Sequence, residues 1–183
     1  DTGDDDDTGD DDDSATILAC DDALLEAALV SLGTWPQQSS CSTSFSTATT
    51  SDDFRLAANF TGASSNPVVG MTWSLSFDGT ALPDLVSGSL EVQTGSSLSV
   101  NDCNDALDPH NQPAVTQQWD PIAGSATMSV TEVFTPGWVG GPTPFNGSVE
   151  LNSVIVELSG SPGTTCEVPD TTWPSLYLGW WPG

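Results

Sequence analysis

The sequence predicts a mainly β protein, an antiparallel β-sandwich of jelly-roll or Ig-like type with one short N-terminal helix and two disulfides. Short segments alternate apolar and polar residues between turn residues, one early segment has helical apolar spacing, and four cysteines are widely spaced. We expect an acidic low-complexity tail at residues 1–13, followed by a single domain at residues 14–183.

The helix is expected near residues 22–32. Asp21 and Asp22 are candidate N-caps, ALLEAALVSL follows with helical apolar spacing, and Gly33 can end the helix. Because almost all of its surface is apolar, we expect the helix to be buried against a sheet or against another subunit.

The strand signals begin after Cys41. Residues 54–61 and 71–77 alternate cleanly, and in-phase runs at residues 90–92 and 98–100 follow. Two later strands change phase midway, which predicts β-bulges near residues 131–132 and 152–153.

The cysteines Cys20, Cys41, Cys103 and Cys166 are an even set without a CxxC pair, and four cysteines allow three pairings. With one histidine in the chain, two disulfides in an oxidising compartment fit better than a zinc site. The preferred pairing is Cys20–Cys41 with Cys103–Cys166.

The charge balance excludes one class of partner. There are 26 acidic residues, one arginine and no lysine, so the formal net charge is −25. Such a surface repels phosphates, which excludes nucleic-acid binding through a basic footprint. No apolar run approaches the roughly 20 residues that span a bilayer, and we expect an extracellular or cell-surface protein whose export signal has been removed.

The acidic tail is the strongest functional signal. Carboxylates at early positions of the pattern D-x-D-x-[ST]-G suit Ca²⁺, although Ala15 replaces the glutamate of an EF-hand. The alternative is a solvated spacer. Asp102 and Asp105 form a second acidic group, either an oxygen cage or an ordinary turn loop. The candidate calcium ligands are Asp4, Asp6, Asp7, Asp10, Asp12, Asp13, Asp102 and Asp105.

Aromatic residues and sequons complete the candidate sites. The aromatic side chains suit a subunit interface, a sugar ring or the domain's own core. Asn59 and Asn146 begin N-x-[ST] sequons and are candidate glycosylation sites. The candidate interface or sugar-binding residues are Trp138, Phe145, Trp173, Trp180 and Trp181.

The repeated TGDDDD of the tail resembles the Asp/Thr/Gly-rich stalks of bacterial secreted surface proteins and lipoproteins. In that class the stalk joins a membrane anchor to an exposed β-domain. No anchoring cysteine precedes this tail, so the resemblance leaves release or assembly open.

These features predict a non-catalytic extracellular structural protein, a self-assembling fibre or surface-coat subunit in which the tail binds Ca²⁺. His110 is the chain's one histidine, and no G-x-S-x-G turn is present, so the sequence gives little support to an enzyme. The alternative is a carbohydrate-binding module that stacks sugars on Trp138, Phe145, Trp119 or Trp173. A third possibility is that the acidity is a halophilic adaptation.

Overall fold

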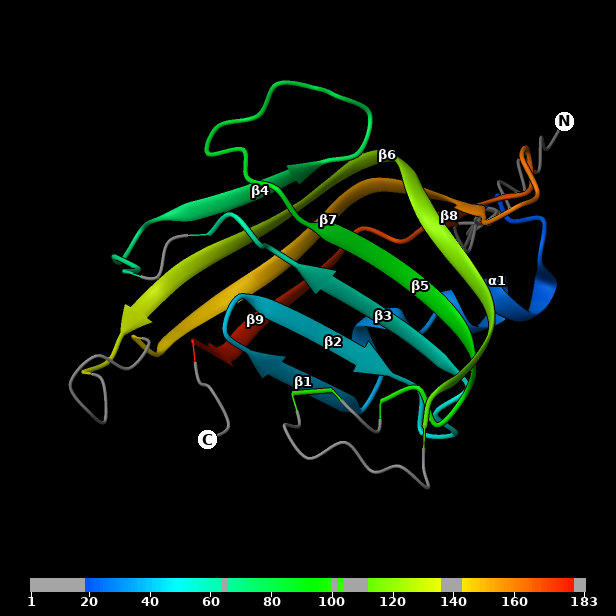
Figure 1. Cartoon of the computed structure of the whole chain (residues 1–183), viewed down its shortest axis with the longest axis horizontal. Helices are drawn as coiled ribbons and strands as arrows, with labels where there is room; N and C mark the ends of the chain where they lie inside the picture. Colours follow the sequence, from blue (N-terminus) through cyan, green and yellow to red (C-terminus); the bar gives the residue numbers. More distant parts are fainter. Residues whose placement is uncertain (1–18, 64–65, 100–101, 104–111, 136–142, 180–183) are drawn as a thin grey trace, which may run out of the picture.

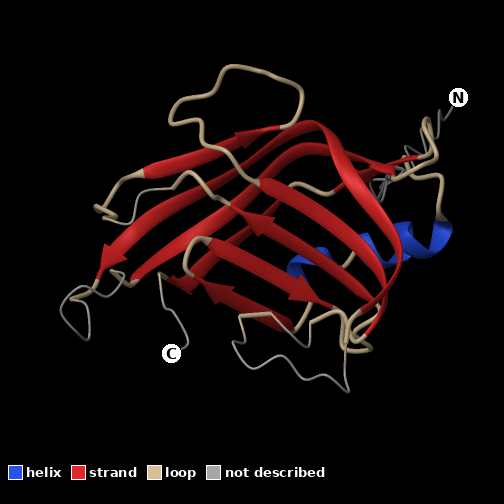
Figure 2. Cartoon of the chain, in the orientation of Figure 1, coloured by secondary structure: helices blue, strands red, loops and turns tan. Residues whose placement is uncertain are grey.

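The computed structural model describes residues 19–63, 66–99, 102–103, 112–135 and 143–179. These residues form a mainly β structure with one α-helix, two disulfides and nine antiparallel strands (Figures 1 and 2), as the sequence predicts. The strands are β1 (Gln37–Cys41), β2 (Ser44–Ala48), β3 (Phe54–Asn59), β4 (Thr72–Ser76), β5 (Ser89–Ser96), β6 (Ala114–Val133), β7 (Phe145–Leu158), β8 (Thr165–Val168) and β9 (Thr171–Leu178).

Two long strands organise the sheet, in which β1, β2, β3, β5, β6, β7 and β8 follow one another. The first part of β6 pairs with β5, and its second part pairs with β4. In the same way, the first part of β7 pairs with β9 and the second part with β8. Both strands therefore belong to two parts of the sheet, and they curve strongly between these parts (Figure 1).

The curvature coincides with an irregular stretch in the pairing of β6 with β7, where the register shifts on both sides of Ala123. Gly124 has a φ of +86°, and a Cβ atom on it would lie 2.3 Å from the backbone oxygen of Ser153. Glycine is the residue that accepts both the left-handed backbone and this close approach. The bulge expected near residues 152–153 is confirmed here, and a further register shift between Val130 and Glu132 confirms the first one.

The apolar faces of the two parts of the sheet meet in the core. Phe45 of β2 packs on Trp173 of β9 with 4.7 Å between ring centroids, which joins the two parts. Within one part, Trp73 of β4 packs on Phe145 of β7 at 5.8 Å. This packing is consistent with the predicted sandwich. Along β3 and β5 the buried side chains alternate with outward-facing ones, so each strand contributes every second residue to the core.

Helix α1 (Ala23–Leu29) begins as the sequence predicts. The Asp22 carboxylate accepts hydrogen bonds from the backbone N–H groups of Leu24 and Leu25, which satisfies two donors of the first turn. The predicted end is wrong, because the helix ends at Leu29 and Gly33 lies within a separate short 3₁₀ turn (Leu32–Thr34). None of the helices in the described ranges is long and apolar enough to cross a membrane.

The preferred disulfide pairing is wrong. Cys20 bonds Cys166 of β8, and Cys41 at the end of β1 bonds Cys103. The reason lies in the topology, because residues 19–21 run alongside β8 and not beside β1. The Asp21 N–H donates to the Thr165 carbonyl at 2.9 Å, and Glu167 N–H donates to the Ala19 carbonyl at 2.9 Å.

The strand expected at residues 98–100 is also corrected in its described part, since β5 ends at Ser96 and residues 97–99 form a bend and a turn, while residue 100 lies outside the described residues. Ser97 has a φ of +55°, which ends the extended run. Leu98 is buried all the same, with 2% of its surface exposed. Its apolar character reflects burial in a turn, which an alternating pattern does not distinguish from strand pairing.

Other parts of the chain lie against the outer strands of the sheet. Residues 19–21 cover β8, and Leu85 forms a parallel bridge with Ser74 of β4. At β1 the Gly179 N–H donates to the Ser42 carbonyl at 2.7 Å, and the Ser40 hydroxyl donates to the Tyr177 carbonyl of β9 at 2.5 Å. These contacts protect the strand edges against pairing with a further strand.

Candidate functional site

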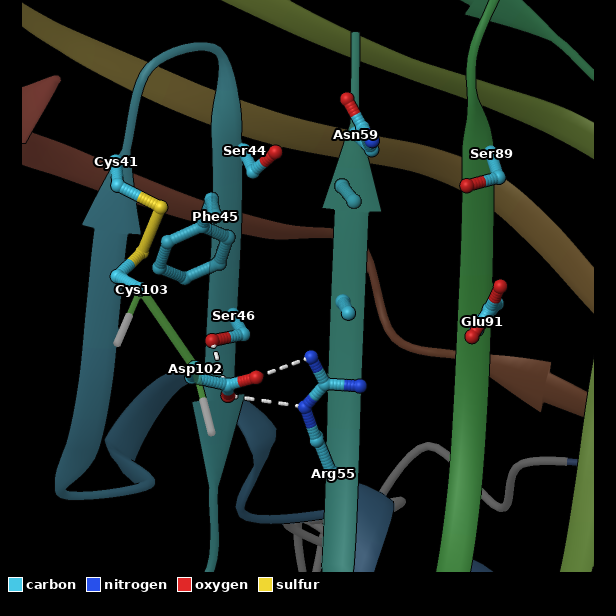
Figure 3. Close-up of a pocket in the computed structure, with 12 residues that line it drawn as sticks. Cys41, Ser44, Phe45, Ser46, Arg55, Asn59, Ser89, Glu91, Asp102 and Cys103 are labelled. Carbon is cyan, nitrogen blue, oxygen red and sulfur yellow. Dashed lines mark hydrogen bonds and ion pairs between the residues drawn. A yellow bond between two sulfur atoms is a disulfide. The ribbon is translucent and has the colours of Figure 1, made fainter. Parts of the chain in front are cut away.

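A pocket of about 290 Å³ lies on the polar outer face of β2, β3 and β5 (Figure 3). The strand register places the side chains in rows, because residues opposite one another in neighbouring strands share a face. Ala57 provides a small side chain between Ser46 and Glu91. The Cys41–Cys103 disulfide lies at one side of the pocket. The two rows, from β2 to β3 to β5, are Ser44, Asn59 and Ser89, and then Ser46, Ala57 and Glu91.

Arg55 of β3 forms one wall of the pocket through a two-point ion pair with Asp102. Its Nε donates to Asp102 Oδ2 at 2.9 Å, and its Nη2 donates to Oδ1. The Arg55 side chain is 18% exposed and the Asp102 side chain 10%. A two-point hydrogen-bonded pair at this depth is more strongly held than a solvent-exposed salt bridge.

Hydrogen bonds extend the ion pair on both sides. The Ser46 hydroxyl donates to Asp102 Oδ2 at 2.5 Å, and Arg55 Nη1 donates to Gln93 Oε1 at 3.0 Å. Gln93 in turn donates from Nε2 to Glu91 Oε2 at 3.1 Å. The pocket therefore has one paired cation, one paired anion and one further carboxylate.

The segment that carries Asp102 is fixed to the sheet at both of its described ends. The Ser99 N–H donates to Asp52 Oδ1 at 2.9 Å, and the Ser99 hydroxyl donates to Gln37 Oε1 at 2.7 Å. At the other end Cys103 is bonded to Cys41. The disulfide thus holds the acidic partner of Arg55 over β2 and β3.

Of the eight predicted calcium ligands, the structure describes Asp102. Asp4, Asp6, Asp7, Asp10, Asp12, Asp13 and Asp105 lie outside the described residues. Asp102 is described, and its two oxygens accept hydrogen bonds from Arg55 and Ser46. Within the described ranges, no group of three or more His, Cys, Asp or Glu side chains is arranged to hold a metal ion.

The predicted aromatic contact residues divide into two groups. Phe145 and Trp173 are core residues, with 1% and 2% of their surfaces exposed, and Trp119 is fully buried. Their rings are therefore not available for stacking on a sugar. Trp138, Trp180 and Trp181 lie outside the described residues.

The two sequons occupy different settings. Asn59 is exposed at the end of β3, whereas Asn146 lies within β7, paired with Glu132 of β6 and Tyr177 of β9. The Asn146 Nδ2 group donates to Glu132 Oε2 at 2.9 Å. No hydrogen bond among the described residues involves the Asn59 carboxamide.

The sequence reasoning missed Arg55 as a site residue. The available signal was its rarity, since it is the chain's one Lys or Arg residue, against 26 acids. An arginine in an alternating strand is expected to point outward, but its partner cannot be identified without the fold.

The groups that line the pocket are able to bind a polar ligand. Hydroxyl, carboxamide, carboxylate and guanidinium groups surround a small apolar centre, and such a lining suits a neutral ligand with several hydrogen-bonding groups. Comparison of the chain with models of protein families, with curated proteins and with solved structures finds no match.

Proposed function

We propose that the chain is a non-catalytic extracellular structural protein that assembles with copies of itself into a fibre or surface coat, with Ca²⁺ bound by the acidic tail at residues 1–13. The observation that carries the proposal is a pair of exposed apolar surfaces on a chain whose net charge is −25. We call them the helix-end patch (Ala23, Leu24, Ala27 and Val30) and the loop-end patch (Val68 and Val69).

The helix-end patch is the outward side of α1. Leu25 and Leu29 face the core, while Leu24 and the C-cap residue Val30 are 76% and 69% exposed. Ala23 and Ala27 lie between them on the exposed arc, since each helical residue advances by about 100°. A helix that is apolar on both sides is typical of one that packs on a second partner.

The loop-end patch lies in the segment that leads into β4. Val68 and Val69 are each 61% exposed, and their loop is fixed to the sheet because the Gly70 N–H donates to the Val130 carbonyl at 2.9 Å. This segment lies at the end of the molecule opposite α1 (Figure 1). Contacts between unlike surfaces at opposite ends build an open chain of subunits, as required for a fibre.

The charge of the chain explains why cations would control such assembly. Copies that each have a net charge of −25 repel one another, and the repulsion extends over a Debye length of roughly 8 Å at physiological salt. Divalent cations neutralise carboxylates in flexible oxygen geometry. Assembly by pairing of strand edges from two copies is less suitable, because irregular backbone already covers the edges of β4 and β8. The two disulfides are compatible with an extracellular location.

Sedimentation velocity of the full chain with calcium, with EDTA and with sodium at matched ionic strength tests the proposal. We expect assemblies in calcium that dissociate in EDTA. A monomer under all three conditions would contradict self-assembly. Equal assembly in sodium and in calcium would contradict the specific role of Ca²⁺ and indicate general charge screening instead.

Variants at the two patches test the geometry. Leu24→Ser/Val30→Ser and Val68→Ser/Val69→Ser should each block chain growth, because each variant keeps one functional patch. Mixed together, the two variants should form dimers and no larger species, since one intact helix-end patch meets one intact loop-end patch. The matched control is Thr80→Ala, a change outside both patches. Assembly that survives both double substitutions would overturn the head-to-tail arrangement.

A further inference from the structure

Asn59 lies at the edge of the pocket, with a small side chain on either side. Ser44 of β2 and Ser89 of β5 are its direct cross-strand neighbours, and all three residues line the pocket (Figure 3). A group attached to Asn59 Nδ2 would therefore start at the opening of the pocket and have two hydroxyl groups within reach. Larger neighbours at these positions would fill that space.

The backbone around Asn59 also suits modification. β3 ends at Asn59, and the buried ring of Phe60 fixes the chain before a turn at Thr61 and Gly62. Thr61, which completes the sequon, is exposed. Acceptor asparagines of this type are surface residues. At the second sequon the Asn146 amide nitrogen is engaged by Glu132 and lies between β6 and β9.

The charges of the pocket select the kind of group that fits. Arg55 is paired with Asp102, so neither acts as a free charge, and Glu91 accepts a hydrogen bond from Gln93. An anion would meet the unneutralised carboxylate of Glu91. A neutral polyol can donate to Glu91 and can exchange hydrogen bonds with the serine hydroxyls. The volume of about 290 Å³ is close to the lower limit of roughly 300 Å³ for small-molecule pockets, which suits one sugar ring.

We infer that Asn59 is N-glycosylated and that the first pyranose ring of the glycan lies in the pocket formed by Ser44, Ala57, Ser89 and Glu91. Asn146 remains unmodified in the folded protein. Glycosylation of Asn59 does not depend on self-assembly, because it involves the polar outer face of β2, β3 and β5 and neither of the two apolar patches.

The covalent step requires a donor in which a sugar is joined through its anomeric carbon to a phosphate or diphosphate carrier. The bond between the anomeric carbon and the phosphate oxygen breaks, and the carrier phosphate leaves with the electron pair. A bond forms from the anomeric carbon to Asn59 Nδ2, which loses one amide proton to a base. No atom is oxidised or reduced.

Intact-mass and glycopeptide mass spectrometry of the chain secreted from an N-glycosylating host tests the modification. We expect a glycan on Asn59 and none on Asn146. Thr61→Ala should abolish it, while the matched Thr61→Ser should retain it, since serine also completes the sequon. Asn146→Gln should leave the mass of the glycan unchanged. An unmodified Asn59 in protein that is secreted and folded would overturn the inference.

A double-mutant cycle tests whether the ring occupies the pocket. Thermal unfolding of Thr61→Ser and Thr61→Ala measures the gain in Tm from the glycan, for which we expect about 2–4 °C. The same pair is then measured with Ala57→Leu, which fills the centre of the pocket and leaves the sequon intact. The gain should disappear in that background. An equal gain with and without Ala57→Leu would show that the glycan stabilises the protein elsewhere.

Discussion

The Cys20–Cys166 and Cys41–Cys103 disulfides lie in different surroundings. Cys166 is fully buried in β8, and its bond to Cys20 holds residues 19–21 along the outer edge of that strand. Both Cys41 and Cys103 are half-buried, and their bond holds Asp102 against Arg55 on a polar face. The first disulfide therefore supports the core and a sheet edge, whereas the second supports a pocket. Removal of each disulfide should therefore affect a different part of the structure.

The largest effect is expected from Cys20→Ala/Cys166→Ala. The bond links residues 146 positions apart, and the chain-entropy relation gives a loss of about 5 kcal/mol for a loop of that length. The covered edge of β8 would also be freed. Urea unfolding followed by tryptophan fluorescence measures the change in free energy. A loss smaller than that for the second disulfide would contradict the comparison.

A somewhat smaller effect is expected from Cys41→Ala/Cys103→Ala. Here the separation is 62 residues, for which the same relation gives about 4 kcal/mol. The structural effect should be local, because no core residue is removed. Hydrogen exchange measured by mass spectrometry should accelerate in residues 39–46, 97–99 and 102–103 and stay unchanged in β7. Uniform acceleration across the chain would show that this disulfide, too, supports the core.

The ion pair gives a third test. Arg55→Gln should cost about 1–3 kcal/mol, because the Asp102 carboxylate loses its charged donor and stays partly buried. A double-mutant cycle with Asp102→Asn isolates the interaction between the two side chains. We expect the coupling to weaken in the Cys41→Ala/Cys103→Ala background, where the segment keeps its Ser99 hydrogen bonds but loses the covalent anchor next to Asp102. Coupling of unchanged size there would show that the ion pair positions the segment without the disulfide.

The smallest effect concerns Asp53, in the turn between β2 and β3. Hydrogen bonds from the Ser51 and Thr49 hydroxyls, each 2.6 Å long, lower the pKa of the Asp53 carboxyl below its model-compound value of 3.8. A lowered pKa favours the folded state above the unfolded-state pKa, and this contribution is lost as the pH falls through the folded-state value.

Asp53→Asn should therefore reduce stability slightly at neutral pH and flatten the loss of stability below pH 3.8. Thermal unfolding across this range measures the effect, with the matched control Asp84→Asn at a carboxyl elsewhere on the surface. An identical pH dependence of the wild type and the Asp53→Asn variant would show that Asp53 does not contribute to the change in stability at acid pH.

Local patterns in the sequence predicted much of the fold. The alternation at residues 54–61 and 71–77 predicted β3 and β4, and the phase changes predicted the bulges in β6 and β7. Asp22 is the N-cap that its residue type suggests. These features depend on residues that are close in sequence, and so composition and period were sufficient to identify them.

The candidate site could not be predicted in the same way. Arg55 and Asp102 are separated by 47 positions, and their contact depends on β3 pairing with β2 and on the route of the chain after β5. The pocket likewise requires residues from three strands in register. The acidic tail was the strongest sequence signal, and its calcium role stays a prediction because residues 1–18 lie outside the described part of the chain.

The sequence by itself determined the alternation of buried and exposed residues, the helix start, the bulges and the extreme charge. The tertiary structure alone decided which cysteines pair, which aromatic rings are buried and what neutralises Arg55. The physical reason is that hydrophobic periodicity records which side of an element is buried, but not which element covers it. Partners distant in the chain are chosen by strand order and register, which no local pattern specifies.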